Sequence, residues 1–337
     1  MNQPNPLALA QLQALAPPTL PSLRASRYFG DDNSVVLADF TPADQAVIKE
    51  MYATLITLMG HLRQQKDTAF DLPSLQALLT QLSWPALIKQ LQQLGTTMPE
   101  HAATHLGEAI HDIRGGSFAA LSINVQMLSL GLVEDDDLLR IFFLVRDHLK
   151  IMRNAVRDID LQRYRADWEQ KLHNVKLIVE KWTNTIHKVS NSSAQIELDC
   201  QFDGNISERC LEFSALDRVL YNMVNNAVRH TADKVVYLSI FPADPAQPHD
   251  VRFVIYNAIA PEHRQTLQQH FGDNLNQVFG SGFTTGGSGL GLRICAHFVA
   301  NAYGIHSFEE ATSAGYFGAT LLDSYFVNWF HWPVAAD

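Results

Sequence analysis

The chain has 337 residues, of which 47% are hydrophobic, and it carries a formal net charge of −10. A chain of this length predicts two or three domains with real hydrophobic cores. The acidic balance disfavours nucleic acid as a partner, because phosphate contacts need clustered Lys and Arg and no basic patch is visible. No apolar run is long enough for a membrane span, and the N-terminal sequence does not resemble a signal peptide, so we expect a cytoplasmic protein. Three scattered cysteines are too few for a disulfide framework or a zinc site.

The first 96 residues have the pattern of a helical region with no catalytic motif. Thr41-Pro42-Ala43-Asp44 supplies the capping hydroxyl, the early proline and the carboxylate that favour a helix start. The helix that follows has an apolar stripe, and two shorter helices are expected near Pro73–Leu82 and Pro85–Leu94. The stripe predicts packing within this region. A docking surface for a separate sensor protein is the alternative.

Residues 97–165 predict a hairpin of two long helices. Thr97-Met98-Pro99-Glu100 has the spacing of a capping box and should open the first helix. The second helix begins after an acidic turn, and its apolar residues are separated by alternating gaps of four and three: Leu138, Phe142, Val145, Leu149, Met152, Val156 and Ile159. Such a seam is typical of a coiled coil. One hairpin cannot bury both seams, so two should pair into a four-helix bundle, which predicts a homodimer.

The first helix of this hairpin carries the sequence His111-Asp112-Ile113-Arg114. Ile110 and Ile113 fall on its apolar stripe, so His111 should lie beside the stripe and be exposed. An imidazole can accept phosphate at one ring nitrogen while an adjacent carboxylate holds the proton on the other. A solvated surface histidine is the alternative, since the chain has fourteen histidines.

Two later stretches together predict a nucleotide pocket. Asn222 and Asn226 lie four residues apart and share one face of a predicted helix. Gly286-Gly-Ser-Gly-Leu-Gly-Leu292 is a glycine-rich turn that runs directly into another predicted helix, so that backbone N–H groups can approach phosphate. Amide oxygens suit Mg²⁺ as well as ribose and phosphate oxygens. The turn has the spacing of neither a dinucleotide-binding motif nor a P-loop.

The remaining pattern after residue 160 is mixed helix and strand. Residues 160–170 should form a charged link, and a helix should begin near Trp168. Alternation or β-branched content predicts strands at Gln195–Cys200, Val235–Ile240 and Val251–Tyr256, and at the aromatic tail 325–332.

In this order and at this separation, Asn222–Thr231 and the glycine turn resemble the N box and the second glycine box of the histidine-kinase ATP-binding domain. Type II topoisomerases, Hsp90 chaperones and mismatch-repair ATPases share that fold. His111-Asp112-Ile113-Arg114 similarly resembles the H box of the dimerisation and phosphotransfer domain. The resemblance implies a multidomain α and α+β protein in three parts. These are an N-terminal helical region at 1–96, a phosphotransfer hairpin at 97–165 and an α/β-sandwich ATP-binding domain of the Bergerat type at 166–337.

The resemblance also implies roles for individual residues. His111 would be the phosphoacceptor, Asp112 the general base and Arg114 an orienting or electrostatic residue. Asn226 would coordinate Mg²⁺, and ATP would be held by the following residues of this sequence: Asn222, Asn226, Arg229, His230, Asn257, Thr284, Thr285, Gly287, Gly289, Leu290 and Gly291. Among these, His230 takes the place of an aromatic residue that stacks on adenine.

Two departures from the family pattern alter these expectations. Gly115 stands where members that also dephosphorylate their partner have a Thr or Asn that positions water, so we expect weak phosphatase activity. Gly116 replaces a helix-bending proline, and the glycine pair could itself produce a kink. In the first glycine box, Asn257-Ala-Ile-Ala-Pro261 replaces an aspartate and two glycines. Asparagine can still accept a hydrogen bond from adenine, but the lost charge should weaken ATP binding roughly tenfold.

Three functions are compatible with these motifs. The first is a cytoplasmic histidine kinase that uses ATP to phosphorylate His111 and passes the phosphoryl group to an aspartate in the receiver domain of a response regulator. The second is a phosphotransfer scaffold that uses His111 without binding ATP. The third is a hydrolysing ATPase of the topoisomerase or chaperone kind. The third is disfavoured, because those enzymes have a glutamate at the position of Asn222 and an amide cannot act as a general base.

Overall fold

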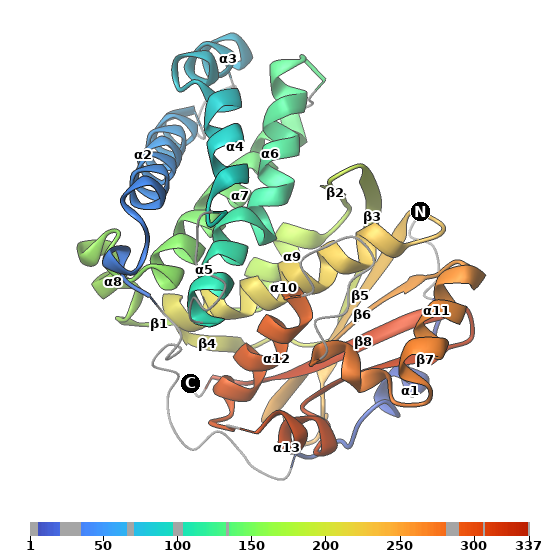
Figure 1. The fold of residues 1–337 in the computed structure, drawn as a ribbon. Helices are drawn as coiled ribbons and strands as arrows, with labels where there is room; N and C mark the ends of the chain where they lie inside the picture. The colour runs from blue at the N-terminus through green and yellow to red at the C-terminus, as the bar shows by residue number, and fades with distance from the viewer. Residues whose placement is uncertain are drawn as a thin grey trace. The chain divides into compact units, whose positions relative to one another are not determined.

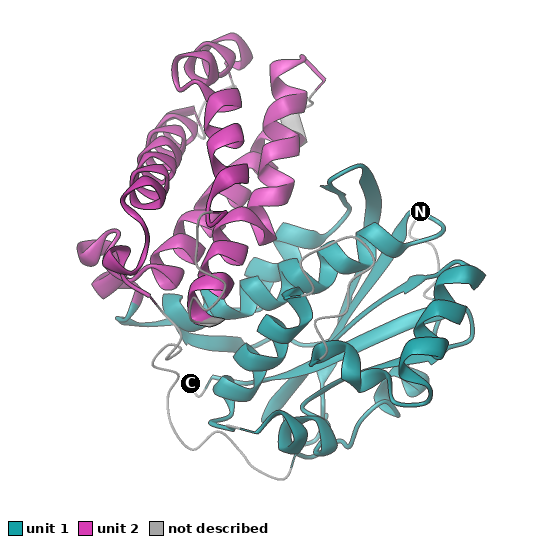
Figure 2. Ribbon diagram, in the orientation of Figure 1, with its two compact units in different colours: residues 1–31, 168–337 teal, residues 32–167 magenta. Residues whose placement is uncertain are grey.

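The computed structural model describes residues 6–20, 35–65, 71–96, 104–132, 135–280, 290–305 and 307–335. The chain forms two compact units, of which one is built from residues 32–167 and the other from residues 1–31 together with 168–337 (Figure 2). A helical region followed by a mixed α/β domain was expected. The three expected segments differ from these units, because the N-terminal residues belong to the same unit as the C-terminal sheet.

The unit 32–167 is helical (Figure 1). It contains a short 3₁₀ turn, Leu37–Asp39, and the helices α2 (Pro42–Gln65), α3 (Leu72–Gln81), α4 (Trp84–Gln93), α5 (Thr104–Arg114), α6 (Gly116–Ser129), α7 (Asp135–Ala155) and α8 (Leu161–Asp167). The start of α2 is as predicted, since the Thr41 hydroxyl accepts a hydrogen bond from the backbone N–H of Asp44 at 3.2 Å. Residues 161–167 form a helix, so the expectation of a charged link there is wrong.

The central helix of this unit is α7, which packs against α2, α5 and α6. Its seam residues Val145, Leu149 and Met152 are at most 4% exposed within a single chain. The seam of α7 is therefore covered within one chain and does not itself require a second hairpin, so the homodimer stays a prediction. Helix α2 carries its own apolar stripe onto α7, so it takes the place that a second hairpin was expected to fill.

The helix predicted to continue through residue 115 is broken into α5 and α6. Gly115 has φ −108° and ψ −145°, and Gly116 has φ +51°, a left-handed conformation that favours glycine. The kink suggested by the glycine pair is therefore present, and it lies one turn after His111.

The other unit is a two-layer α/β sandwich around a six-stranded sheet of strand order β2-β3-β5-β6-β8-β7. The strands are β2 (Thr185–Val189), β3 (Ser192–Cys200), β5 (Val235–Pro242), β6 (Asp250–Ala258), β7 (Phe317–Leu322) and β8 (Tyr325–Pro333). Neighbouring strands are antiparallel except for β3 and β5, which are parallel. The four strands expected from the sequence are all present. Strand β1 (Gln170–Asn174), which pairs with β4 (Asn205–Arg209), lies where the helix from Trp168 was expected to begin.

Helices α10 (Cys210–His230) and α12 (Gly291–Ala302) pack on one face of the sheet, as Figure 1 shows. The unit also contains α9 (Lys176–Trp182), α11 (Pro261–Phe271), a 3₁₀ helix (Leu275–Phe279) and α13 (Phe308–Ser313). Side chains alternate between the faces of a strand, so Phe253 and Phe330, which are paired across β6 and β8, both point toward the helical layer. Their rings stack 4.8 Å apart. The core between sheet and helices therefore has large aromatic side chains at its centre.

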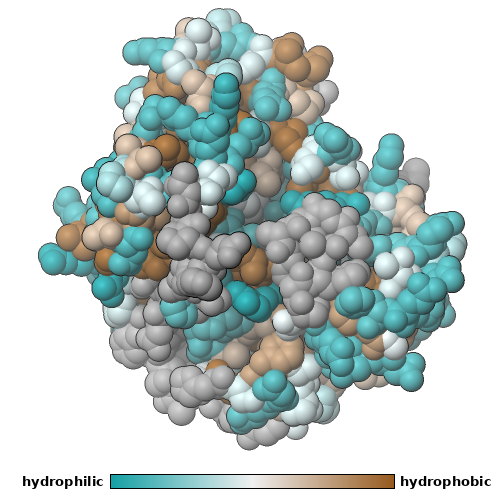
Figure 3. All heavy atoms as spheres, viewed as in Figure 1, coloured by the Kyte–Doolittle hydropathy of each residue, from teal (hydrophilic) through white to brown (hydrophobic). Residues whose placement is uncertain are grey.

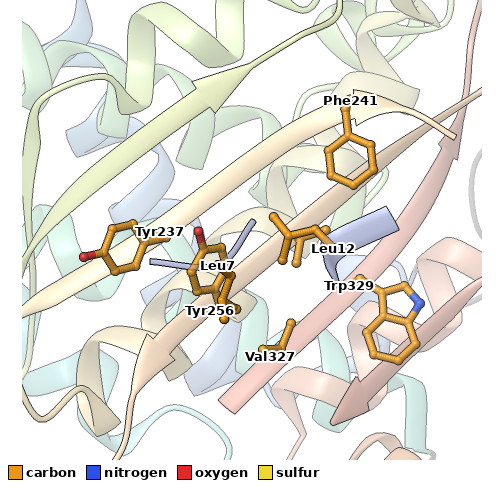
Figure 4. Close-up of a cluster of buried hydrophobic side chains, with 8 residues drawn as sticks. Leu7, Leu12, Tyr237, Phe241, Tyr256, Val327 and Trp329 are labelled. Carbon is orange, nitrogen blue, oxygen red and sulfur yellow. The ribbon is translucent and has the colours of Figure 1, made fainter. Parts of the chain in front are cut away.

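The opposite face of the sheet is covered by the N-terminal segment. Leu7 precedes helix α1 (Leu9–Gln13) and Leu12 lies within it. Both leucines are buried against a cluster of sheet residues: Tyr237, Phe241, Val254, Tyr256, Val327 and Trp329 (Figure 4). We call residues 6–20 the N-terminal strap. Burying a leucine side chain stabilises the folded state by about 2 kcal/mol, so this contact makes the strap part of the sheet unit.

A buried arginine fastens the strap. The guanidinium of Arg252 on β6 donates hydrogen bonds to the backbone carbonyls of Leu12, Gln13, Ala16 and Pro17 at 2.6–3.1 Å, and its Nε donates to His331 at 2.9 Å. Burial lowers the pKa of Arg252 to about 10, which leaves it charged at neutral pH. The carbonyls at the end of α1 are thus satisfied by a side chain from the sheet.

No helix in the described ranges is long and apolar enough to cross a membrane. The face of the molecule drawn in Figure 3 is mainly hydrophilic, with hydrophobic residues scattered among polar ones.

Candidate functional site

Three polar side chains on α10 lie on one face of the helix and have no partner among the residues that the structure describes. Asn222, Asn226 and Arg229 are four and three residues apart, which places them along one helical stripe. Within the part of the chain that the structure describes, none of the three makes a side-chain hydrogen bond or ion pair. Asn222 is nonetheless 93% buried by the protein, at a relative exposure of 7%. Buried amides are normally hydrogen-bonded, so an amide without a partner in the described residues is available to a ligand.

The neighbouring amide behaves differently. Asn225 is 3% exposed, and its Oδ1 lies 2.8 Å from Nε2 of His187 on β2, close enough for a hydrogen bond. Asn225 therefore joins α10 to the edge strand. Asn225 thus has a structural partner, whereas its neighbour Asn226 has none within the described ranges.

The second glycine box lies directly against this stripe. A Cβ atom at Gly291, the first residue of α12, would sit 3.6 Å from Oδ1 of Asn222 and 3.8 Å from its Cβ. Two contacts join helices α10 and α12. The thiol of Cys295 donates a hydrogen bond to the carbonyl of Val219 at 3.5 Å. The guanidinium of Arg218 lies 4.0 Å from the ring centre of Phe298, a cation–π contact. Asn222 and Gly291 are sixty-nine residues apart in the sequence, yet the fold brings their two motifs together at one place.

The N-terminus of α12 adds a second feature to the site. Leu290 is half-buried and immediately precedes the helix, and its carbonyl accepts the hydrogen bond of Ile294. The first N–H groups of a helix have no partner within the helix and favour an anion. The predicted residues Thr284, Thr285, Gly287 and Gly289 lie outside the described residues.

Asn257 lies near the end of β6 and faces the helical layer. It alternates in register with Phe253 and Ile255, and it is 1% exposed. Its Nδ2 donates to the backbone carbonyl of Ala258 at 3.1 Å, which directs the amide nitrogen to the protein and leaves Oδ1 as the acceptor. Helix α11 begins at Pro261, so strand and helix are joined without a glycine-rich loop.

His230 lies at the C-terminus of α10 and stacks on a second histidine. Its ring is 4.5 Å from that of His263 on α11, at an interplanar angle of 6°. Burial, then the positive potential of His263 and Arg229, lowers the pKa of His230 to about 4, so its ring is neutral at physiological pH. A flat, neutral imidazole is present where the resemblance implied an aromatic residue. His263 was not predicted, because a single histidine on an amphipathic helix gives no sequence signal.

The candidate phosphoacceptor lies in the helical unit. Nδ1 of His111 is 3.5 Å from Oδ1 of Asp112, and the two side chains are 15% and 2% exposed. His111 was expected to be exposed, but most of its side chain is covered and only 15% is accessible. Arg114 is exposed and donates to the carbonyl of Leu94 at 3.1 Å, which ties the end of α5 to the end of α4.

Gly115 lies close to both the backbone and the ring of His111. A Cβ at this position would lie 2.7 Å from the backbone oxygen of His111 and 3.7 Å from its Nε2. The first distance is shorter than real Cβ atoms tolerate, so only glycine fits here without movement of the backbone. Because Asp112 faces Nδ1, the absence of a side chain at residue 115 keeps the opposite nitrogen, Nε2, uncovered from that side.

A buried histidine that the sequence did not single out lies near the helix break. His148 on α7 is fully buried, and its Nδ1 is 3.1 Å from the hydroxyl of Ser117 at the start of α6. Burial lowers the pKa of His148 to about 3, although the nearby carboxylate of Asp112 acts in the opposite direction. A neutral, hydrogen-bonded imidazole thus bridges α7 and the first turn of α6. Its position on an apolar helix face was the only sequence signal for it.

The comparisons with known proteins agree with this geometry. Residues 212–320 match the family described as histidine kinase-, DNA gyrase B-, and HSP90-like ATPase. No curated protein matches the chain in sequence. Similar solved structures include the catalytic domain of the histidine kinase ThkA, with 18% identity over 41% of this chain and 78% of that one, and a TM-score of 0.29.

Two further similar structures cover a larger share of this chain. The full-length ShkA in complex with AMPPNP has 20% identity, covers 74% of this chain and 47% of that one, and gives a TM-score of 0.33. The Acinetobacter baumannii histidine kinase AdeS has 14% identity, covers 67% and 98%, and gives a TM-score of 0.29. The match over residues 212–320 lies within the sheet unit and includes both Asn222 and Gly291, so this region is similar to the ATPase domain of the histidine kinase, DNA gyrase B and HSP90 family.

Proposed function

We propose that the chain is an ATP-dependent protein-histidine kinase that phosphorylates His111. The observation that carries this proposal is the stripe of polar side chains on α10 that have no partner within the described residues; it lies against the glycine that opens α12, in the region that matches the ATPase family. The N–H groups at the start of α12 and the guanidinium of Arg229 both favour the negative charge of a triphosphate.

Each residue of the site has a role in this proposal. The carboxamide oxygen of Asn226 would hold Mg²⁺, and a single protein oxygen fits a cation that is otherwise held by phosphate oxygens and water. The metal would neutralise charge on the transferring phosphoryl group. Asn222 and Arg229 would contact phosphate oxygens, and Oδ1 of Asn257 would accept a hydrogen bond from the amino group of adenine.

At the acceptor, Asp112 would hold the proton on Nδ1 of His111, so that the lone pair on Nε2 attacks the γ-phosphorus. The bond from the γ-phosphorus to the bridging oxygen breaks, ADP leaves, and the phosphoryl group stays on Nε2. Arg114 would provide positive charge close to this nitrogen. A receiver-domain aspartate of a response regulator in the cytoplasm would then take the group.

Incubation with γ-labelled ATP and Mg²⁺ tests the proposal. We expect acid-labile label on the wild-type protein and none on His111→Gln. The matched control is His105→Gln, because His105 is an exposed histidine on the same helix α5 and should keep full labelling. Label that survives in His111→Gln would reject the assigned acceptor.

The first glycine box favours a second candidate, a phosphotransfer scaffold that does not bind ATP. Asn257 replaces an acid, and α11 follows β6 without the glycines of the family pattern. Calorimetry separates the two candidates. Heat of binding with millimolar MgATP that disappears in Asn226→Ala supports the kinase. No heat with the wild-type protein, together with phosphoryl transfer from a phosphorylated receiver domain to His111, supports the scaffold.

A further inference from the structure

A second cluster of reactive groups lies outside the nucleotide site, where β1, β4 and α10 meet. His173 comes from β1, Ser207 from β4, and Cys210 is the first residue of α10. His173 is 5% exposed and Ser207 is fully buried, whereas Cys210 is a half-buried free thiol. The imidazole is also held by stacking on Phe213, at 5.0 Å between ring centres.

The hydrogen bonds in this cluster have a fixed direction. The Ser207 hydroxyl donates its one proton to the carbonyl of Arg209 at 3.0 Å. Its oxygen can then only accept from Nδ1 of His173, which lies 3.0 Å away, so the ring carries its proton on Nδ1. Nε2 is left with a lone pair, and it lies 3.4 Å from Sγ of Cys210. The thiol therefore donates to an imidazole nitrogen that is ready to take its proton.

Cys210 also lies at a helix N-terminus and near two charged side chains. Cys210 lies in the first turn of a 21-residue helix, whose N-terminus carries partial positive charge. The neighbouring charged groups are Arg209, whose guanidinium donates to the carbonyl of Trp168, and Glu212, whose carboxylate accepts from the N–H of Glu208 at 2.7 Å. Both are engaged in hydrogen bonds with the backbone.

We propose that Cys210 is a reactive thiol, activated by His173, that is modified by peroxides and by carbon electrophiles. This site is independent of ATP and of His111. A cysteine paired with an imidazole whose other nitrogen is oriented by a third group has the arrangement of an activated nucleophile.

The reaction with a peroxide balances as follows. The Sγ proton moves to Nε2 of His173, and the thiolate sulfur attacks one oxygen of hydrogen peroxide. An S–O bond forms while the O–O bond breaks, and the leaving hydroxide takes the proton from the imidazolium to give water. Cys210 is oxidised to a sulfenic acid and the peroxide is reduced.

The other two cysteines provide internal controls. Cys200 is also half-buried, but its thiol donates to the carbonyl of Phe202 at 3.3 Å, and burial followed by the charges of Asp199 and Asp203 raises its pKa. Cys295 is fully buried in the packing of α12 on α10. The expected order of reactivity is Cys210, then Cys200, then Cys295.

The test is the rate at which each cysteine of the full chain reacts, followed by peptide mass spectrometry. Iodoacetamide serves as the carbon electrophile, and hydrogen peroxide with a sulfenic-acid trap serves as the oxidant. At pH 7 we expect Cys210 to react at least about tenfold faster than Cys200 with both reagents. His173→Phe, which preserves stacking on Phe213, should reduce the Cys210 rate to that of Cys200, and Ser207→Ala should lower it several-fold.

Two results would overturn the proposal. One is a Cys210 that reacts no faster than Cys200 in the wild-type protein, a comparison that needs no variant and so does not depend on folding. The other is an unchanged Cys210 rate in a His173→Phe protein whose thermal transition matches the wild type.

Discussion

Gly291 lies in van der Waals reach of Asn222, with an added Cβ 3.6 Å from the amide oxygen. The contact joins two motifs that are far apart in the sequence. It also suggests a size limit, because a methyl group at Gly291 would already be in contact with the Asn222 amide, so a larger side chain would crowd it.

This limit predicts a difference between two substitutions at one position. Gly291→Ala places a methyl at ordinary contact distance, so we expect its MgATP affinity to stay within about threefold of the wild type. Gly291→Val adds two carbons that would displace the Asn222 amide, and we expect at least about a tenfold loss, equivalent to 1.4 kcal/mol. Titration calorimetry measures both. Equal affinities would show that Asn222 does not contact the nucleotide.

The adjacent amides of α10 should separate binding from stability. Asn226→Ala removes a side chain without a protein partner in the described ranges, so it should abolish Mg²⁺-dependent ATP binding and leave the thermal transition unchanged. Asn225→Ala removes the hydrogen bond to Nε2 of buried His187 and should cost about 1–2 kcal/mol of stability. Thermal denaturation with and without MgATP measures both effects. A loss of stability in Asn226→Ala would contradict its assignment to the ligand.

Glycine at 115 should be structurally required, unlike glycine at 107. A Cβ at Gly115 would lie 2.7 Å from the carbonyl oxygen of His111, so Gly115→Ala should destabilise the helical unit by about 1–3 kcal/mol. Gly107 is in the middle of α5 with nothing within 4 Å of an added Cβ, and Gly107→Ala should stabilise by about 0.5–1 kcal/mol. Denaturant unfolding of the pair measures the difference. If both substitutions stabilise the protein, the close approach of Gly115 to His111 is absent in solution.

The buried histidines predict acid sensitivity. The pKa of His148 is lowered by burial to about 3 in the folded state, while an unfolded histidine titrates near 6.5. The unfolded state therefore binds more protons between these values, and stability falls as the pH falls below about 6.5. At pH 4 the cost is about 3 kcal/mol.

The matched variant for this prediction is His148→Gln, which keeps a hydrogen-bonding side chain opposite Ser117 but does not titrate. It should be less stable at pH 7 and should show a shallower loss of stability between pH 6.5 and pH 4. Chemical denaturation across that range measures the slope. A slope equal to that of the wild type would mean that His148 does not control the acid response.

Arg252 should hold the strap onto the sheet. Arg252→Met removes the guanidinium that donates hydrogen bonds to four backbone carbonyls of the strap. We expect it to destabilise the sheet unit by about 3 kcal/mol. Arg229→Met is the control, because that arginine is exposed and has no partner within the described residues. Its stability should be unchanged. Hydrogen exchange of residues 6–20 should increase in Arg252→Met alone.

The sequence predicted local features well where a physical pattern is local. The helix start at Thr41, the strands β5 and β6 and the kink at Gly116 follow from capping, alternation and glycine conformation. The amide stripe on α10 also followed from spacing alone. These properties depend on residues that are close together in the chain.

Long-range features were missed or wrongly expected. The seam of α7 predicted a second chain because nothing in its heptads reveals that α2 packs on it. The burial of Asp112 and His148 depends on helices that meet only in the fold. Arg252 looked like an ordinary strand residue, since its partners lie about 240 positions earlier in the chain. The N-terminal strap was assigned to a separate region because the sheet residues on which it packs also lie far from it in the sequence.

The strap has a consequence for how the polypeptide can be divided. The ATPase sandwich is discontinuous in sequence, with the helical unit inserted between its two pieces. A fragment excised at Trp168 would lack its own cover and leave an aromatic surface, including Tyr237 and Tyr256, open to self-association. Because the helical unit is joined to the sheet unit by the chain at both of its ends, a cut at one junction alone would leave the two units covalently linked through the other.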